Sequence, residues 1–142
     1  MTAGPGRPPR LDHVGIAVRS IAEALRFWEA AGLRIEGEEE VAGQDVRVGF
    51  LPLGDTRLEL LEPTDPESPI AKHLDRRGPG LHHISVSVPD IRAAMAQLAA
   101  AGFELLSTEP QPGAHGCLVC FVHPKSAGGV LVELSQPAVD RR

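Results

Sequence analysis

Long apolar segments and surplus positive charge are both absent from this sequence. No stretch of its 142 residues approaches the roughly 20 consecutive apolar residues that a membrane-spanning helix requires. The 14 Lys and Arg residues are outnumbered by 19 Asp and Glu residues, which gives a net charge of -5 at pH 7. Because a phosphate-binding surface needs a basic stripe, this balance argues against nucleic acid as a partner. It is compatible with an anionic small substrate, since a metal ion or one lysine can dominate the charge of a cleft.

Cysteine is scarce too, and the sequence holds only Cys117 and Cys120. Their C-x-x-C spacing lies in the run CLVCFV, which is typical of a strand, and in a strand residues i and i+3 point to opposite faces. No second cysteine pair is present to complete a zinc site. We therefore expect both cysteines to be packing residues rather than a redox or metal motif.

The two ends of the chain also lack structural signals. Residues 1–10 are rich in Gly and Pro and contain no apolar stretch of the kind found in a secretion signal. We expect residues 1–10 and 138–142 to be tails and the protein to be cytoplasmic. The length of the rest suits one compact body, or two half-size units that share a core.

An internal repeat is the most informative feature of the sequence. At an offset of 70, residues 81–105 match residues 11–35 at eight of 25 positions, and one of the matches pairs His83 with His13. At an offset of 74, VLVELSQP answers TRLELLEP, so that Glu133 falls on Glu59. The chain is therefore a duplicated unit, with four extra residues in the loops of the second copy.

The hydrophobic pattern predicts the same order of elements in each copy. An alternating strand comes first, and a helix follows that Ser20 caps and Gly32 ends, as Asp90 and Gly102 do in the second copy. Three strands then complete the unit, near residues 34–40, 45–53 and 57–62 in the first copy and 104–107, 117–122 and 130–134 in the second.

The predicted fold class is therefore α+β, with two tandem βαβββ modules forming a half-open, barrel-like mixed sheet around a metal site. The modules span residues 11–63 and 81–137. Residues 64–80 form a turn-rich linker with a short helix near residues 68–74. The two modules together are expected to make one domain.

Strand alternation places the repeated histidine and glutamate of each copy on the same side of its sheet. His13 shares a strand face with small residues, while the opposite aliphatic face must cover the helix. Glu59 stands between two leucines, and Glu133 between a valine and a leucine, so both carboxylates point away from the helices. A carboxylate in such surroundings is costly to bury unless a positive group meets it.

These repeated residues predict a metal site. A single strand histidine is more often packed than a ligand, but packing does not explain why the His–Glu pair recurs in register when other positions have drifted. Two imidazoles and two carboxylates make a mixed donor set that suits Co, Mn, Ni, Fe or Zn, and four ligands leave positions open for substrate. We predict one divalent metal ion per chain, bound by His13, Glu59, His83 and Glu133.

Five other polar residues carry weaker predictions. His82 must face away from the predicted site, so we expect it to be structural, and we expect His73 to be exposed to solvent. His115 and His123 lie in predicted loops near the mouth of the second copy and are candidates for substrate contact. Lys125 is a candidate partner for an anionic part of the substrate.

With these residues placed, the chain resembles the vicinal oxygen chelate superfamily and, within it, the methylmalonyl-CoA epimerase family. The resemblance covers residues 11–136. LDHVGIAV and LHHISVSV carry the superfamily signal, whereas GDTRLELLEP, SPIAKHL, GLHHI, GAHG and HPKSAGGVLVEL are more typical of the epimerases. The metal positions of the family fall on the four residues predicted above, and some members have glutamine at the position of Glu59.

The resemblance implies a metal-dependent interconversion of (R)- and (S)-methylmalonyl-CoA at C2, with cobalt favoured and a homodimer as the usual assembly. The thioester carbonyl and the carboxylate of such a substrate can both chelate a metal ion, which lowers the cost of the enolate. Glu133 is the candidate base, because a metal-bound carboxylate keeps one oxygen beside the substrate.

One position departs from the family pattern. Some members carry a second glutamate, as the opposing acid or base, on the third strand of the first copy, and the best-aligned residue here is Arg47. The second proton carrier is therefore unassigned, with Asp45, a metal-bound water and a loop histidine as candidates. Arg47 either faces solvent, because Val46 and Val48 alternate with it, or binds the substrate carboxylate.

Other proteins of the same fold have different functions. Glyoxalase I uses the same kind of ligand set, but HPKSAGGVLVEL and SPIAKHL favour the epimerase. Metal-dependent fosfomycin resistance uses three such ligands, so Glu59 argues against it, and a metal-free drug-binding protein has no need of four ligands in register. The sequence does not separate methylmalonyl-CoA from a near relative such as ethylmalonyl-CoA.

Overall fold

The computed structural model describes residues 8–138. Most of the two predicted tails, at residues 1–7 and 139–142, lies outside the described residues. Arg10, which the sequence pattern placed in a tail, belongs to the first strand. The chain divides into two compact units, one from His13 to His83 and one that contains the rest.

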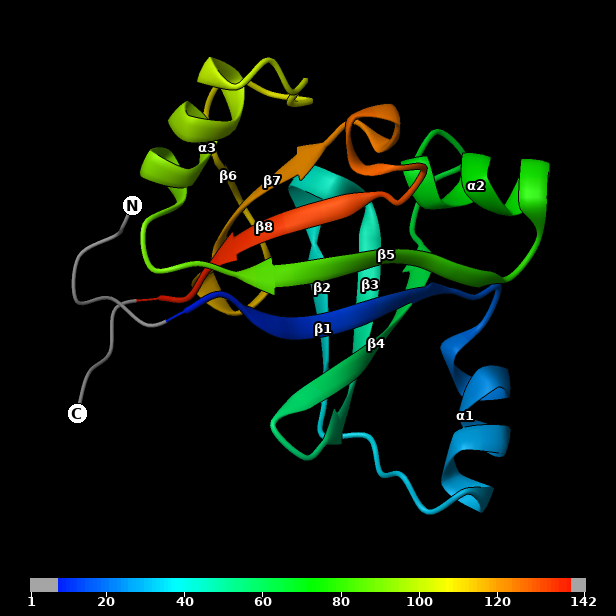
Figure 1. Cartoon of the computed structure of the whole chain (residues 1–142). Coiled ribbons are helices and arrows are strands. Elements are labelled where there is room, and N and C mark those ends of the chain that lie inside the picture. Colours follow the sequence, from blue (N-terminus) through cyan, green and yellow to red (C-terminus); the bar gives the residue numbers. More distant parts are fainter. Residues whose placement is uncertain (1–7, 139–142) are drawn as a thin grey trace. The chain divides into compact units, whose positions relative to one another are not determined.

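In the first unit, four strands pair in the order β2-β3-β4-β1 (Figure 1). The β1–β4 pair is parallel, and the other two pairs are antiparallel. The elements are β1 (Arg10–Ala17), α1 (Ile21–Ala30), β2 (Glu38–Val41), β3 (Val46–Leu53), β4 (Thr56–Pro63) and α2 (Pro69–Arg77).

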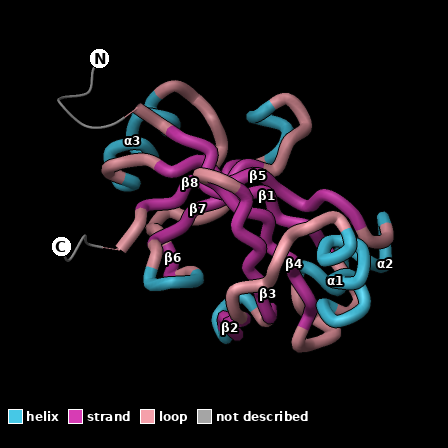
Figure 2. The backbone as a smooth tube through the Cα atoms, turned by 90° about the horizontal axis from the view of Figure 1, so that it is seen from below, coloured by secondary structure: helices cyan, strands magenta, loops and turns pink. Residues whose placement is uncertain are grey.

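The second unit repeats this arrangement, with β5 parallel to β8 and β8-β7-β6 antiparallel. Its elements are β5 (Gly80–Ser87), α3 (Ile91–Ala100), β6 (Gln111–Pro112), β7 (Leu118–Val122) and β8 (Val132–Gln136). Figure 2 colours the helices and strands of both units. Each repeat thus has one strand, a helix and three further strands, so the predicted α+β class with two βαβββ modules is confirmed.

Both long helices begin at the predicted caps. The Ser20 hydroxyl accepts from the Glu23 amide at 3.2 Å, and the Asp90 carboxylate accepts from the Ala93 amide at 3.1 Å. Each bond satisfies one of the amide groups that a helix N-terminus leaves without a partner. None of the described helices is long and apolar enough to cross a membrane.

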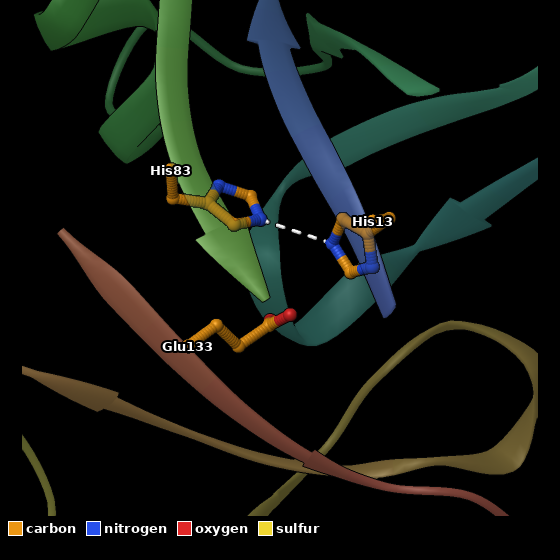
Figure 3. A group of neighbouring side chains, drawn as sticks. All are labelled: His13, His83 and Glu133. Carbon is orange, nitrogen blue, oxygen red and sulfur yellow. Dashed lines mark hydrogen bonds between the residues drawn. The ribbon is translucent and has the colours of Figure 1, made fainter. Parts of the chain in front are cut away.

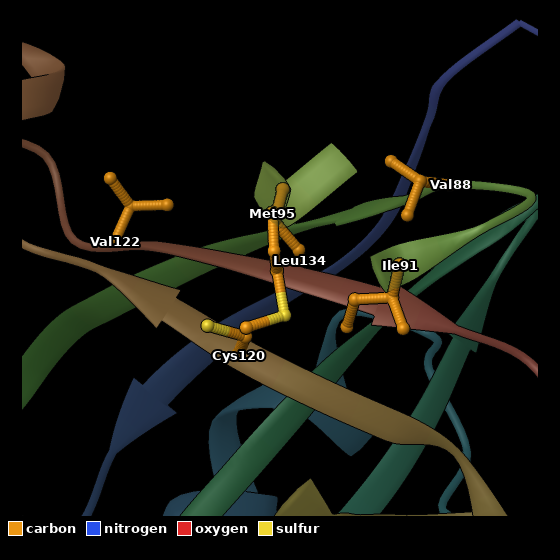
Figure 4. Close-up of a cluster of buried hydrophobic side chains, with 6 residues drawn as sticks. All are labelled: Val88, Ile91, Met95, Cys120, Val122 and Leu134. Carbon is orange, nitrogen blue, oxygen red and sulfur yellow. The ribbon is translucent and has the colours of Figure 1, made fainter. Parts of the chain in front are cut away.

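Each unit buries the aliphatic side of its sheet against its helix. In the first unit the core is built from Val18, Ile21, Leu51, Leu58 and Leu60. Figure 4 shows the core of the second unit, which consists of Val88, Ile91, Met95, Cys120, Val122 and Leu134. Cys120 is buried there and Cys117 is half-buried, both as free thiols, so the prediction of packing cysteines is confirmed for Cys120. The helix-facing side of each sheet is thus apolar, as alternation predicted.

Two predicted strands and the linker helix differ from the structure. The strand expected at 34–40 is regular only from Glu38, because Gly37 has φ +127 and interrupts the extended backbone. The strand expected at 104–107 is reduced to an isolated bridge between Leu105 and Val122, and the edge strand is the short β6. Helix α2 runs past the predicted end to Arg77.

Candidate metal centre

Two buried histidines face each other at the centre of the candidate site. His13 on β1 is 5% exposed and His83 on β5 is 8% exposed. Their Nε2 atoms lie 3.1 Å apart, and the rings meet edge to face; Figure 3 draws this contact as a dashed line, together with Glu133. Two nitrogen ligands at about 2.1 Å from one metal ion lie about 3.0 Å apart when their bonds meet at right angles. The spacing therefore suits a shared metal ion.

Gly15 makes room for the His83 ring. A Cβ at Gly15 would lie 2.3 Å from Cε1, 2.6 Å from Nδ1 and 2.8 Å from Nε2 of His83. Real Cβ atoms do not come this close to other atoms. A residue other than glycine at position 15 would collide with the imidazole of His83, which lies against β1.

A Gly15→Ala variant should therefore displace His83 and weaken metal binding. The added methyl group collides with three ring atoms, so we expect at least about a tenfold loss of affinity for Co²⁺, comparable with the loss when a ligand loses its orientation. Calorimetric titration of the folded variant measures this. Gly43→Ala is the matched control, because nothing lies within 4 Å of a Cβ there. An unchanged affinity in Gly15→Ala would contradict the placement of His83.

The second ring nitrogen of His83 meets another histidine. Nδ1 of His83 lies 2.9 Å from Nδ1 of His82, and the ring of His82 lies edge-on to that of His73 on α2. Burial, with the neighbouring His13 and His82, holds the pKa of His83 well below its usual value. Burial and then His73 lower the pKa of His82 to about 4. These imidazoles are therefore neutral near pH 7, with a lone pair available for a hydrogen bond or a metal.

This contact corrects two expectations. Alternation predicted that His82 faces away from the site, but its Nδ1 reaches that of His83. His73, expected to be exposed, is half-buried against His82. The sequence pattern missed both contacts because it describes strand faces and does not locate a helix that packs beside the strand.

Glu59 is buried beside His13 and paired with an arginine. Its side chain on β4 lies with Oε2 3.3 Å from Nδ1 of His13. The same oxygen accepts hydrogen bonds from Nε of Arg57 at 2.8 Å and from Nη2 at 2.7 Å. Arg57 also lies over the ring of Phe50, 5.8 Å from its centroid. The positive partner that a buried carboxylate requires is thus Arg57, which the sequence pattern missed although it shares the strand face of Glu59.

Removing Arg57 should destabilise the metal-free protein, because Glu59 would keep a buried charge without its counterion. We expect Arg57→Met to lower the free energy of unfolding by roughly 1–3 kcal/mol, less than for a fully buried pair since Arg57 is partly exposed. Arg57→Met/Glu59→Gln should recover most of that loss. Denaturant titration of the chelator-treated proteins measures both. Equal losses in the single and double variants would show that the ion pair is not the cause.

Glu133 occupies the place in its unit that Glu59 occupies in the other. Glu133 is 5% exposed and stands opposite Ser85 of β5 and Phe121 of β7. Glu59 stands opposite Gly15 of β1 and Phe50 of β3 in the same way. The duplication therefore holds at the level of strand register.

The structure places Arg47 away from the face of Glu59. Arg47 and Gly49 point to the same face of β3, which is the face that meets Ile21 and Ile35. Phe50 points to the other face, because it is the cross-strand partner of Glu59. Arg47 is exposed and forms ion pairs with two surface carboxylates, Glu38 at 3.7 Å and Glu40 at 3.3 Å. Asp45 is also exposed and adopts a left-handed conformation, with φ 52, immediately before β3. Of the two readings of Arg47, the structure favours the solvent-facing one.

The three loop candidates all lie in the second unit. His115 is exposed in a short 3-10 turn, with φ 58. His123 is half-buried, and its Nδ1 accepts from the Lys125 amide at 3.1 Å, so the ring caps the following turn. Lys125 is exposed. Their contact with substrate stays a prediction.

Comparison with known proteins places this chain in one superfamily and finds several epimerases among its relatives. The family model described as the Glyoxalase/Bleomycin resistance protein/Dioxygenase superfamily matches residues 12–121. The chain is 42% identical over 130 residues to the ethylmalonyl-CoA/methylmalonyl-CoA epimerase of Cereibacter sphaeroides, covering 89% of this chain and 97% of that protein. It is 42% identical over 129 residues to the mitochondrial methylmalonyl-CoA epimerase of Homo sapiens, covering 89% and 73%.

A solved structure adds a bound ligand to this comparison. It is a variant of the Streptomyces coelicolor methylmalonyl-CoA epimerase in complex with 2-nitronate-propionyl-CoA. The two chains share 35% identity and superpose with a TM-score of 0.86, covering 92% of this chain and 98% of the other. Several of the relatives most similar to this chain are thus named as epimerases of methylmalonyl-CoA.

Proposed function

Because this chain belongs to the Glyoxalase/Bleomycin resistance protein/Dioxygenase superfamily, we propose that it is a methylmalonyl-CoA epimerase. The reaction would interconvert the (R) and (S) forms of methylmalonyl-CoA at C2. The observation that carries the proposal is the pair of buried histidines, each with a buried glutamate on the neighbouring parallel strand of its own repeat. Relatives with these CoA esters in their names support the choice of substrate.

The residues fit a divalent metal ion. Two imidazole nitrogens lie 3.1 Å apart, and the missing side chain of Gly15 leaves room for one of the rings, as a buried cation site requires. We propose that His13, Glu59, His83 and Glu133 hold the ion, with cobalt as the favoured metal. When bound, it would act as a Lewis acid that polarises the thioester carbonyl and lowers the pKa of the C2 proton.

Proton transfer would then fall to the protein. We propose that Glu133 removes the C2 proton, because it is buried, stands in a strand and has the carboxylate basicity that the step requires. A second acid or base is needed to return the proton on the other side of C2. Arg47 does not fill this role, because it pairs with surface carboxylates, and Asp45 is exposed. We propose Asp45 or a loop histidine for that role, and His115, His123 and Lys125 as contacts for the anionic parts of the substrate.

Two parallel assays test this function. The purified protein should convert (S)-methylmalonyl-CoA to the (R) form and should leave the hemithioacetal of methylglyoxal and glutathione unchanged. Conversion of the hemithioacetal without epimerisation of methylmalonyl-CoA would identify a glyoxalase I-type enzyme. Neither activity, together with stoichiometric binding of a drug-like ligand, would identify a binding protein. The same epimerase assay with ethylmalonyl-CoA compares the two candidate substrates. A homodimer in the cytoplasm is the proposed working form.

A further inference from the structure

Each ring nitrogen of His83 faces another imidazole nitrogen. Nε2 lies 3.1 Å from His13 Nε2, and Nδ1 lies 2.9 Å from His82 Nδ1. A neutral imidazole carries its proton on one nitrogen and a lone pair on the other. With the proton on Nδ1, His83 donates to His82, and its Nε2 lone pair accepts from Nε2 of His13 in the metal-free protein. With the proton on Nε2, the nitrogen beside His13 cannot bind a metal ion.

We infer that His82 is a positioning residue, whose Nδ1 accepts the Nδ1 proton of His83 and so leaves the lone pair of His83 on Nε2, the nitrogen that would bind the metal ion. The inference rests on the proposed function in one respect, namely that His83 binds a metal ion. Metal-binding histidines usually donate their outer nitrogen to a fixed acceptor, and loss of that acceptor typically weakens metal binding 10–100-fold.

The acceptor is itself held in place by a helix. The ring of His82 lies edge-on to His73, with centroids 4.9 Å apart, and edge-on to His83, with centroids 5.1 Å apart. His73 belongs to α2, which is anchored by the buried side chains of Ile70 and Leu74. The helix between the two repeats therefore supports the ring that orients His83.

His13 has a comparable arrangement on the other side. Its Nε2 faces His83, and its Nδ1 lies 3.3 Å from Oε2 of Glu59. Both imidazoles therefore turn Nε2 toward each other and present Nδ1 to a neighbouring side chain. A merely structural His82 would not need a nitrogen aimed at the ring of His83.

The test removes this nitrogen and keeps the ring. His82→Phe retains the edge contact with His73, and His73→Phe is the matched control, since the His73 ring meets the ring of His82 edge to face. Titration with Mn²⁺ and Co²⁺ should show 10–100-fold weaker binding in His82→Phe and a change of less than about threefold in His73→Phe. Nitrogen-15 NMR of the metal-free wild type should show His83 protonated on Nδ1.

The outcomes separate the inference from the proposed function. A wild-type protein that binds no divalent ion contradicts the proposed metal-dependent function. The NMR measurement on the metal-free protein still decides which nitrogen of His83 carries the proton. His83 protonated on Nε2 overturns the inference. Unchanged metal affinity in a folded His82→Phe variant also overturns it. If this variant does not fold, the tautomer of the wild type decides the question alone.

Discussion

The Glu133→Gln variant should lose turnover by about 10²–10⁴-fold while it keeps a bound metal ion. The amide retains an oxygen donor but has almost no basicity, and a positioned base contributes a factor of this size. Deuterium exchange at C2 of the substrate measures the proton transfer, and calorimetry measures the metal affinity. The loss should appear in kcat more than in KM, since substrate binding does not depend on the basicity of the carboxylate.

Glu59→Gln is the comparison that gives this result its meaning. Both glutamates are buried, and both stand opposite corresponding residues in the strand register. Glu59, however, is paired with Arg57, and some family members have glutamine at its position. We expect a far smaller loss of turnover than in Glu133→Gln. Equal losses in the two variants would show that Glu133 has no special part in proton transfer.

Replacement of either central histidine should abolish activity. His13→Ala or His83→Ala removes one of two nitrogens that lie 3.1 Å apart, so the ion loses a ligand and Lewis-acid stabilisation worth several kcal/mol. That loss corresponds to a decrease of about 10³-fold or more in turnover. Metal analysis after gel filtration should find far less than one ion per chain.

The matched control for these variants is His115→Ala, which removes an exposed imidazole and should leave the metal content unchanged. Circular dichroism should show that the central variants keep their fold. Full metal occupancy in both His13→Ala and His83→Ala would contradict the assignment of these residues as ligands.

The sequence predicted the parts of the fold that depend on local periodicity. Alternation along the strands placed His13 and Glu59 opposite the aliphatic face, and the cap residues Ser20 and Asp90 predicted where the helices begin. These signals are strong because a one-residue shift would exchange the buried and exposed faces of a strand. The repeated His–Glu register predicted the candidate site in the same way.

The parts that sequence reasoning missed depend on contacts between elements or on irregular backbone. Arg57 was overlooked because an arginine in a strand has no preferred partner until the neighbouring side chain is known. His82 contacts its own neighbour on the strand, which alternation excludes. Arg47 aligns with a family glutamate, but the register of β3 places Arg47 on the helix side of the sheet, whereas Phe50 lies on the side of Glu59. No local pattern reports these arrangements.

The most direct test of the central claim is deuterium incorporation from D₂O into (S)-methylmalonyl-CoA, with and without a chelator. The metal-loaded protein should exchange the C2 proton for deuterium and form the (R) epimer. Removal of the metal should abolish both processes, and added Co²⁺ should restore them. Full exchange by protein shown to contain no divalent metal would contradict the metal-dependent mechanism, and no exchange by metal-loaded protein would contradict the epimerase itself.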